Sequence, residues 1–367
     1  MNQERLSSSS RREFLTGRTL RPDVEIPDAV VPDELPVETE ASNTPTGGAT
    51  VRLSTRAMAC DFSIIMNPGP GDRVMPASDA LDLIHVLEDQ MSVYRESSEL
   101  SQINSRAIHQ DVTVEPKLFN LLLESAHICR KTGAGFDPTS GPLIALWRRC
   151  RQDGRIPTEN EITHCLRHTG LEHVTFDEQN QTVRFDQPGV ELDLGGIGKG
   201  YALDRGGELL LKEGLEDWLF HGGHSSILAR GDHNGCGGWP VGIRNPLFPK
   251  QRLATILLKD CALSSSGSGV QHFRHAGKRY GHILDPRTGR PVEGMLSVTV
   301  LAPTAAEADA LSTAFFVIGV ENTLMHCDNR DDVSVLLIPP PRRGRTLEPV
   351  VCGMPDGVLF FTPDGET

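Results

Sequence analysis

The sequence predicts an α+β fold with helices and mainly antiparallel strands. Two strongly periodic helical segments, at residues 79–93 and 117–131, precede a long succession of short strands that reaches Val300. Helices and strands do not alternate regularly, as they would in a doubly wound parallel sheet. No internal repeat is present, and we expect a single mixed domain over residues 49–367.

In the first half of the chain, residues 50–66 are predicted as strand. The helix at 79–93 is amphipathic, because its apolar residues recur at helical spacing, namely Leu81, Ile84, Leu87 and Met91. A second helix is predicted at 117–131, with Gly133 as its stop. A short hairpin is predicted at 173–185, with its turn at Glu178-Gln179-Asn180.

The second half begins with a predicted helix at 201–213, which Gly214 closes. Strands then follow one another up to Val300. Another helix is predicted at 305–318, and two last strands are predicted near 333–338 and 358–362.

Composition excludes several classes of protein. The chain has 367 residues and a formal net charge of −13, and a nucleic-acid partner would require a basic face. No apolar stretch approaches the about 20 residues that span a bilayer. The eight cysteines include no CxxC pair, so the sequence indicates neither a zinc knuckle nor a redox dithiol. We interpret them as reduced, mostly buried thiols.

The first 48 residues are predicted to be a disordered arm rich in proline and glutamate. Residues 10–15, Ser-Arg-Arg-Glu-Phe-Leu, resemble a twin-arginine export motif. The following segment, 16–40, is charged and contains no hydrophobic region, which such a signal needs in order to insert. We therefore expect a cytoplasmic protein.

A glycine-rich cassette at residues 193–204, DLGGIGKGYALD, follows an alternating strand and opens a helix. Backbone amides of glycines at a helix N-terminus can approach an anion closely, and Lys199 adds a positive charge. The spacing fits neither a Walker A loop nor a GxGxxG dinucleotide fingerprint. The pattern predicts phosphate contact, with a purely structural turn as the alternative.

A second cassette, HILDPRTG at residues 282–289, places His282 and Asp285 three residues apart at a Pro-containing turn. An imidazole there can carry protons near neutral pH. His282 is therefore the candidate general acid or base, with a core histidine as the alternative. Asp285 either orients it or caps the turn. His221 and His224 lack a carboxylate or thiol that would complete a metal site, and we interpret them as loop residues.

The helix at 305–318 contains the candidate metal ligands. Thr304 and Glu307 form a capping-box pattern, which places Asp309 and Thr313 at i and i+4 on one helix face. Their Cβ atoms are then about 5–6 Å apart. A carboxylate and a hydroxyl suit Mg²⁺, which is usually shared with phosphate oxygens. We expect Asp309 on the helix surface near a cleft. The alternative is a solvated Asp309 and a packed Thr313 without a metal.

Four further motifs occur in a fixed order along the chain. They are Ala57-Met58-Ala59-Cys60-Asp61-Phe62, then residues 94–100 with Asn104, then residues 135–143, and last residues 308–314. Together with the two cassettes, they make residues 50–362 resemble the ApbE family of FAD:protein FMN transferases. Some positions depart from the family pattern: Ala59-Cys60 replaces Gly-Thr, Gly135 replaces a common alanine, and His224 stands where Asn or Asp is usual.

The resemblance implies an ApbE-like fold with the FAD site in a cleft between subdomains. It implies FAD contacts from Met58, Tyr94, Gly135, Phe136, Asp137, Asp193, Lys199 and Ile283. It implies Mg²⁺ ligands at Asp309, Thr313 and the main-chain carbonyl of Gly196, while Asp204 is expected to brace the glycine loop.

The implied activity is Mg²⁺-dependent transfer of FMN from FAD to a Thr or Ser hydroxyl of an acceptor flavoprotein, with release of AMP. His282 would act as the general acid or base and Asp285 would orient it. Two alternatives stay open from the sequence. One is a Mg²⁺-dependent FAD pyrophosphatase that yields FMN and AMP, and the other is a non-catalytic FAD-binding protein.

Overall fold

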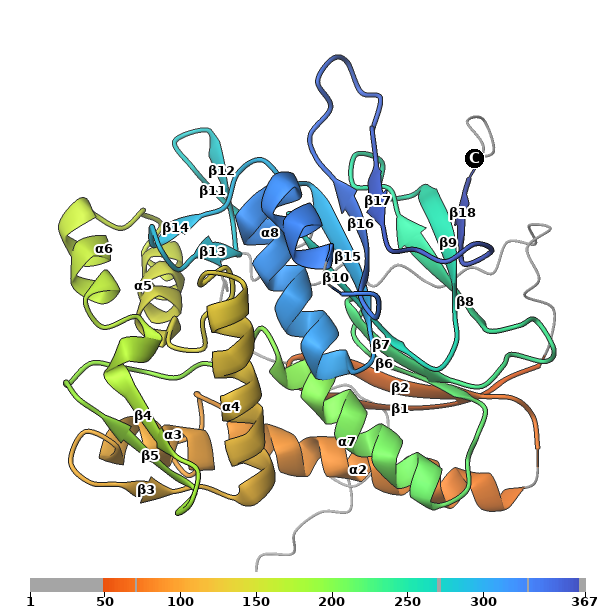
Figure 1. Cartoon of the computed structure of the whole chain (residues 1–367), viewed down its shortest axis with the longest axis horizontal. Coiled ribbons are helices and arrows are strands. Elements are labelled where there is room, and N and C mark those ends of the chain that lie inside the picture. The colour runs from red at the N-terminus through yellow and green to blue at the C-terminus, as the bar shows by residue number, and fades with distance from the viewer. Residues whose placement is uncertain (1–48, 70, 269–271, 329, 363–367) are drawn as a thin grey trace, which may run out of the picture. The chain divides into compact units, whose positions relative to one another are not determined.

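A large antiparallel sheet is the main sheet of the described residues (Figure 1). The computed structural model describes residues 49–69, 71–268, 272–328 and 330–362. The predicted arm and the twin-arginine-like motif lie outside the described residues. The eight strands of the sheet are ordered β1-β2-β6-β7-β10-β15-β16-β17. They are β1 (Val51–Ala57), β2 (Cys60–Met66), β6 (Trp218–Gly222), β7 (Ser226–Arg230), β10 (Ala262–Gly267), β15 (Ser297–Ala302), β16 (Ser334–Ile338) and β17 (Val350–Cys352).

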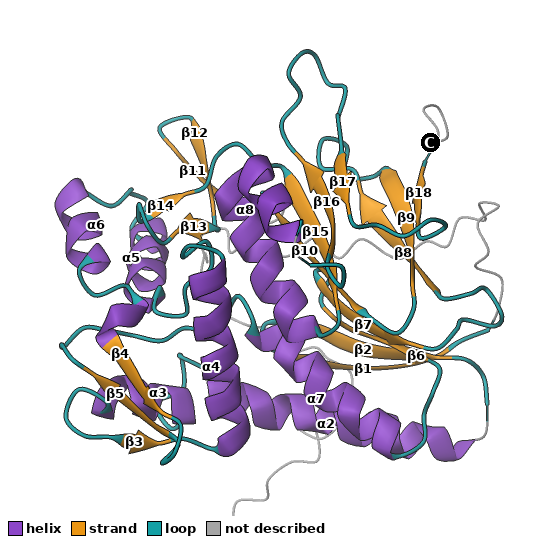
Figure 2. Ribbon diagram, in the orientation of Figure 1, coloured by secondary structure: helices purple, strands orange, loops and turns teal. Residues whose placement is uncertain are grey.

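Three long helices cover one face of this sheet (Figure 2). They are α2 (Val74–Met91), α7 (Gly198–Lys212) and α8 (Ala305–Cys327). The main core lies between them and the sheet, and its largest fully buried side chains include Trp218, Phe220 and Phe315. Helices α7 and α8 also pack against each other. This layer therefore brings the glycine cassette next to the helix that carries Asp309.

A smaller sheet, ordered β18-β9-β8, covers the opposite face. Its strands are β8 (Trp239–Arg244), β9 (Arg252–Leu258) and β18 (Leu359–Phe361). Strand β16 shows why both faces are apolar: Val335 and Leu337 belong to the helix-side core, while Leu336 and Ile338 belong to the core under the small sheet. Side chains alternate between faces along a strand, so a strand buried on both sides is apolar at every position.

The remaining helices form the part of the chain that carries residues 99–185 (Figure 1). They are α3 (Glu99–Arg106), α4 (Pro116–Lys131), α5 (Gly141–Gln152) and α6 (Glu159–Leu166), with the 3₁₀ turn η2 (Leu171–His173). A further 3₁₀ turn, η1 (Gly71–Arg73), directly precedes α2. A three-stranded sheet joins them, made of β3 (Val112–Thr113), β5 (Thr182–Phe185) and β4 (Val174–Asp177). Two short hairpins lie near α5, namely β11 (His272–His275) with β12 (Lys278–Gly281), and β13 (Leu284–Asp285) with β14 (Arg290–Pro291).

The predicted α+β class is confirmed, since every described strand pairing is antiparallel. The predicted helices at 79–93, 117–131 and 201–213 correspond to α2, α4 and α7, and the hairpin at 173–185 corresponds to β4 and β5. Helices α3, α5 and α6 were not predicted.

The prediction of a single strand at 50–66 is wrong, because the chain reverses there. Strands β1 and β2 form a hairpin in which Ala57 faces Cys60. The two turn residues, Met58 and Ala59, have φ angles of 49° and 59°. Such left-handed turns usually contain Asn or Gly, so the apolar Met-Ala pair gave no turn signal.

Helix α8 is longer than predicted and is broken at Gly319, whose φ is 78° and ψ is −177°. The predicted end at Ile318 therefore matches the end of its first segment. Only half of the predicted capping box forms. The Thr304 side chain accepts a hydrogen bond from the Glu307 amide at 3.2 Å, but the Glu307 carboxylate pairs with Arg330 at 2.8 Å.

No helix among the described residues is both long and apolar enough to cross a membrane.

Replacing Gly200 by alanine should strongly destabilise the fold. A Cβ atom at Gly200 would overlap the backbone carbonyl of Ala305, where α7 crosses the start of α8. Backbone atoms cannot move aside as a flexible side chain can, so we expect a loss of about 3 kcal/mol or more. Urea unfolding would measure it. The control is Gly71→Ala, because nothing lies within 4 Å of a Cβ atom there. Equal stability of the two variants would contradict this close approach.

Candidate functional site

Asp309 lies in the interior between α8 and the sheet, with an exposed fraction of only 5%. Its Oδ2 atom accepts a hydrogen bond from the Gly200 amide at 2.7 Å. Its Oδ1 atom accepts two, from the hydroxyls of Ser226 at 2.6 Å and Ser264 at 2.7 Å. The expectation of an Asp309 on the helix surface is wrong, because α7 and strands β7 and β10 enclose its carboxylate.

Gly196 and Thr313 lie beside each other next to this carboxylate. A Cβ atom at Gly196 would be 3.6 Å from Thr313 Oγ1. No described residue donates a hydrogen bond to the Gly196 carbonyl oxygen, and the Thr313 hydroxyl makes no hydrogen bond to any described residue. The Gly200 amide, which could have bonded to Gly196 four residues earlier, donates to Asp309 instead. The structure thus brings together the three predicted oxygen ligands.

These residues fit a hard divalent cation. A buried carboxylate is costly unless it is paired, and no described Lys, Arg or His forms an ion pair with Asp309. One carboxylate, one hydroxyl and one carbonyl oxygen form the donor set, and Mg²⁺ prefers oxygen donors. A Mg²⁺ ion with few protein ligands completes its coordination with water and phosphate oxygens.

Three of the four glycine amides in the cassette are already bonded within the protein. Gly195 donates to Asp193 Oδ1 at 2.7 Å, Gly198 to the Leu194 carbonyl at 2.7 Å, and Gly200 to Asp309. The predicted phosphate contact of the glycine cassette could therefore use few of these amides, and it stays a prediction. Among the described residues, only the Gly196 amide of these four has no acceptor.

Lys199 extends from the first turn of α7 toward the same carboxylate. Its Nζ donates a hydrogen bond to Ser225 Oγ, which lies 3.4 Å from Ser226 Oγ. Ser226 in turn donates to Asp309. Lys199 also lowers the pKa of the Cys60 thiol, although burial raises that pKa more strongly. The ammonium group and the candidate metal ligands thus belong to one connected polar cluster.

Gly135, Phe136 and Asp137 form a loop that packs against this cluster. The Phe136 ring lies 3.1 Å from a Cβ atom placed at Gly196. A Cβ atom at Gly135 would lie 2.6 Å from the Ile318 side chain, so glycine permits the loop to approach α8. Asp193 is joined to this region by its amide, which donates to the Pro138 carbonyl at 2.8 Å.

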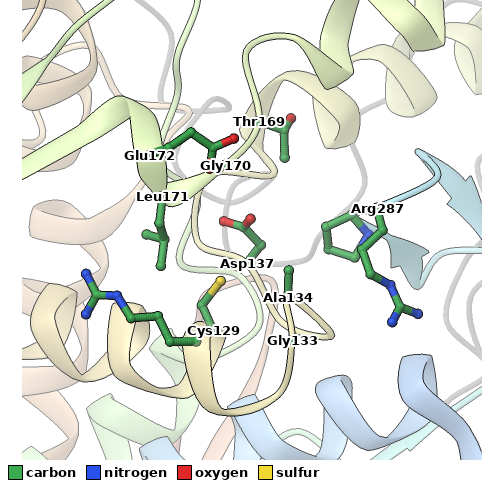
Figure 3. Close-up of a pocket in the computed structure, with 11 residues that line it drawn as sticks. Cys129, Gly133, Ala134, Asp137, Thr169, Gly170, Leu171, Glu172 and Arg287 are labelled. Carbon is green, nitrogen blue, oxygen red and sulfur yellow. The ribbon is translucent and has the colours of Figure 1, made fainter.

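A cavity of about 320 Å³ opens around Asp137 (Figure 3). The Asp137 carboxylate accepts hydrogen bonds from the Thr139 amide at 2.8 Å and hydroxyl at 2.6 Å. Burial nevertheless raises its pKa, as burial raises the pKa of the adjacent Cys129 thiol. Figure 3 shows the Cys129 sulfur directed toward Asp137 and the Arg287 guanidinium directed away from it. The cavity joins residues after α4 to the turn of the second cassette.

Of the eight predicted FAD contacts, Asp137 lines this cavity, whereas the other seven do not, namely Met58, Tyr94, Gly135, Phe136, Asp193, Lys199 and Ile283. Tyr94 is 71% exposed, and the Arg148 guanidinium lies 4.5 Å from the centre of its ring. Arg148 also lowers the pKa of Asp193, against the larger raising effect of burial. Met58 is held at the β1–β2 turn by its amide, which donates to Glu88 Oε1 at 2.8 Å.

In the second cassette, His282 lies in an exposed loop and Asp285 lies at the turn that follows it. His282 is exposed in the loop between β12 and β13, so the alternative of a core histidine is wrong, while Ile283 is buried. The Asp285 carboxylate accepts hydrogen bonds from the Arg287 amide at 2.9 Å and from its guanidinium at 2.8 and 2.9 Å. These bonds support the turn-capping role of Asp285, and its orienting role stays a prediction.

Asp204 does not brace the glycine loop, because its carboxylate caps another helix. It accepts hydrogen bonds from the amides of Ala305 and Ala306, both at 2.8 Å, at the start of α8. Burial raises its pKa to about 7. The sequence gives no local indication of this contact.

Four polar residues of the site were not identified from the sequence, namely Arg148, Ser225, Ser226 and Ser264. Ser226 and Ser264 occupy core-facing positions of β7 and β10 whose neighbours on that face, Leu228 and Ala262, are apolar. A buried polar residue among apolar ones usually has a specific partner. That pattern could have singled out the two serines, but not their partner.

Comparison with known proteins shows which family this chain is similar to. The chain matches the ApbE family model over residues 50–337. It is 31% identical to an FAD:protein FMN transferase of Vibrio cholerae over 295 residues, which covers 78% of this chain and 87% of the relative. It is 34% identical to an FAD:protein FMN transferase of Escherichia coli K12 over 241 residues, with coverages of 64% and 68%.

Solved structures of ApbE proteins are similar to this chain in both fold and sequence. The crystal structure of the ApbE protein from Thermotoga maritima has a TM-score of 0.74 and 30% identity, covering 82% of this chain and 96% of that one. The flavin transferase ApbE from Vibrio cholerae has a TM-score of 0.74 and 29% identity, with coverages of 83% and 97%.

Proposed function

This chain belongs to the ApbE family and is an FAD:protein FMN transferase, and we propose how its residues perform the transfer. The substrate is FAD, and the second substrate is an acceptor protein. The observation that most supports a chemical role for the site is the grouping of Gly196, Asp309 and Thr313 beside Lys199.

The acceptor group that we propose is a Thr or Ser hydroxyl of a flavoprotein. Its oxygen forms a bond to the FMN-side phosphorus of FAD. The bond between that phosphorus and the bridging oxygen breaks, and AMP leaves with the bonding electrons. The proton of the hydroxyl passes to a base, so that FMN remains joined to the acceptor through a phosphoester.

Lys199 and the Gly196 amide are suited to bind the pyrophosphate, because they lie at the start of α7, where an anion is favoured. Gly196, Asp309 and Thr313 would hold Mg²⁺. When bound, that ion would neutralise charge on the phosphates. Much of the acceleration would come from holding the two substrates in line.

His282 is the proposed base that takes the acceptor's proton. It is exposed, as a residue that meets a protein substrate has to be. Ile283 is buried and anchors the loop that carries it. The neighbouring bonds between Asp285 and Arg287 keep the next turn in shape. Positioned proton transfer typically contributes about 10²- to 10⁴-fold to a rate.

The test is incubation with FAD, Mg²⁺ and a candidate flavoprotein, followed by denaturing electrophoresis read for flavin fluorescence. A fluorescent acceptor band is the expected result. The matched control is the same acceptor with its target Ser or Thr replaced by alanine, which should stay dark. Soluble FMN and AMP without a labelled acceptor would indicate a pyrophosphatase, and unchanged FAD would indicate a non-catalytic binding protein.

We also expect Arg148→Ala to weaken FAD binding by up to about 30-fold, because the substitution removes the cation–π contact of about 0.5–2 kcal/mol that holds the Tyr94 ring in place. Arg148 lies over the Tyr94 ring and near Asp193, two predicted FAD contacts. Quenching of flavin fluorescence would measure the dissociation constant. The matched control is Arg149→Ala. Arg149 is the next residue and is exposed, and its charge lowers the pKa of Cys165 in α6, against the larger raising effect of burial. Unchanged binding in Arg148→Ala would remove Arg148 from the FAD site.

A further inference from the structure

The hydrogen bonds around Asp309 limit how its carboxylate can meet a cation. Both oxygens of the carboxylate already accept bonds from the protein: Oδ1 accepts two and Oδ2 accepts one. A carboxylate has about four acceptor positions in all. The position that remains belongs to Oδ2, the oxygen that also bonds to the Gly200 amide at the start of α7.

Two serines occupy Oδ1, and the sheet itself holds them in place. Ser226 of β7 and Ser264 of β10 are directly paired across the two strands, so their hydroxyls leave the sheet on the same face. Ser226 has no exposed surface and Ser264 is 2% exposed. A third serine, Ser312, lies 3.2 Å from Ser264 Oγ and donates to the Asp309 carbonyl at 3.0 Å.

We propose that Ser226 and Ser264 are positioning residues for the cation site. By occupying Oδ1, they leave Asp309 a single oxygen for the metal, beside the unbonded Gly196 carbonyl and Thr313 hydroxyl. This inference rests on the proposed Mg²⁺ dependence of the transferase. It adds that these two serines set both the affinity of the site and its preference among divalent cations.

The preference follows from the number of oxygens that remain. Ca²⁺ takes six to eight oxygen ligands and often binds a carboxylate through both oxygens, whereas Mg²⁺ accepts one carboxylate oxygen and retains waters. Two hydrogen bonds to Oδ1 oppose the two-oxygen mode, since a metal there would displace a buried donor. The geometry therefore favours Mg²⁺ over Ca²⁺, and loss of a serine should reduce this discrimination.

The experiment uses Mn²⁺ as a paramagnetic probe of the full-length protein. Free Mn²⁺ is measured by electron paramagnetic resonance in the presence of ADP, the part of FAD that carries both phosphates but no flavin. Mg²⁺ and Ca²⁺ are then added as competitors. We expect Ser264→Ala and Ser226→Ala each to weaken Mn²⁺ binding by about 10- to 100-fold, the usual cost of losing a residue that orients a metal ligand. The advantage of Mg²⁺ over Ca²⁺ should shrink in both variants.

The matched control is Ser265→Ala. Ser265 is the next residue along β10 and points to the opposite face, where its hydroxyl lies 2.8 Å from Thr299 Oγ1. The Ser265→Ala variant should bind Mn²⁺ with the affinity of the unmodified protein. Thermal unfolding of all three variants would show that they are folded, and the affinity comparison is made on folded protein.

Four results would overturn the inference. They are wild-type Mn²⁺ affinity in folded Ser264→Ala and Ser226→Ala, an equal loss in Ser265→Ala, equal competition by Mg²⁺ and Ca²⁺ in the unmodified protein, and no Mn²⁺ binding at all. An FMN-transfer assay on the unmodified protein distinguishes failure of the positioning role from failure of the proposed function. If the unmodified protein transfers FMN and the two serine variants bind Mn²⁺ normally, only the positioning role is contradicted. If the unmodified protein neither binds Mn²⁺ nor transfers FMN, the proposed function is contradicted as well.

Discussion

Asp309→Ala is expected to reduce FMN transfer by about 10³-fold, the kinetic equivalent of about 4 kcal/mol of lost stabilisation. The substitution removes the carboxylate of the candidate metal site. It also leaves the Gly200 amide and the hydroxyls of Ser226 and Ser264 without their acceptor. Unsatisfied buried donors cost about 1–3 kcal/mol, so the free energy of unfolding should fall as well. Assays over a Mg²⁺ series, with urea unfolding in parallel, measure both effects.

Thr313→Val separates the two effects of Asp309→Ala. Its hydroxyl makes no hydrogen bond to a described residue, and its side chain is only half-buried. We therefore expect a smaller loss of activity in the same direction, strongest at low Mg²⁺, with nearly unchanged stability. Normal turnover of Asp309→Ala at limiting Mg²⁺ would show that the metal site has been assigned to the wrong residues.

His282→Asn should lower the transfer rate by about 10²- to 10⁴-fold at saturating FAD and Mg²⁺ while FAD still binds. Asparagine retains some hydrogen bonding but cannot carry a proton at neutral pH. The side chain is exposed, so the substitution should leave the fold intact. Stopped-time assays give the rate, and calorimetry gives the dissociation constant of FAD.

A suitable control is His109→Asn, because His109 is an exposed histidine just after α3. It should behave as the unmodified protein in both measurements. If His282→Asn instead bound FAD weakly but turned over normally once saturated, His282 would be a pyrophosphate ligand. An unchanged rate and an unchanged affinity would leave it without a role in the reaction.

Prediction from the sequence succeeded where the determining interactions are local. The helix ends at Gly133 and Gly214 followed from glycine, and both residues have positive φ angles of 56° and 78°. Prediction failed at the Met58-Ala59 turn, where side chains that disfavour positive φ are held in that conformation. The Met58 amide is bonded there to Glu88, a residue of a neighbouring helix.

The candidate site residues also divide into those that local spacing places and those that only packing places. Asp309 and Thr313 were placed on one helix face by their spacing alone, because backbone geometry sets the separation of residues four apart. The motif order along the chain was enough to indicate the family. Asp193 and Lys199 were singled out from the glycine cassette and stay predictions, and the bonding of three of the cassette's amides was not foreseen.

Only the tertiary structure decided the surroundings of Asp309. The donors Gly200, Ser226 and Ser264 lie 109, 83 and 45 residues away in the sequence. They meet the carboxylate because β7 pairs with β10 and because α7 crosses α8 closely enough to require glycine at position 200. A periodic sequence pattern determines which face of an element is buried, but the partner that each buried polar group finds depends on which elements pack together.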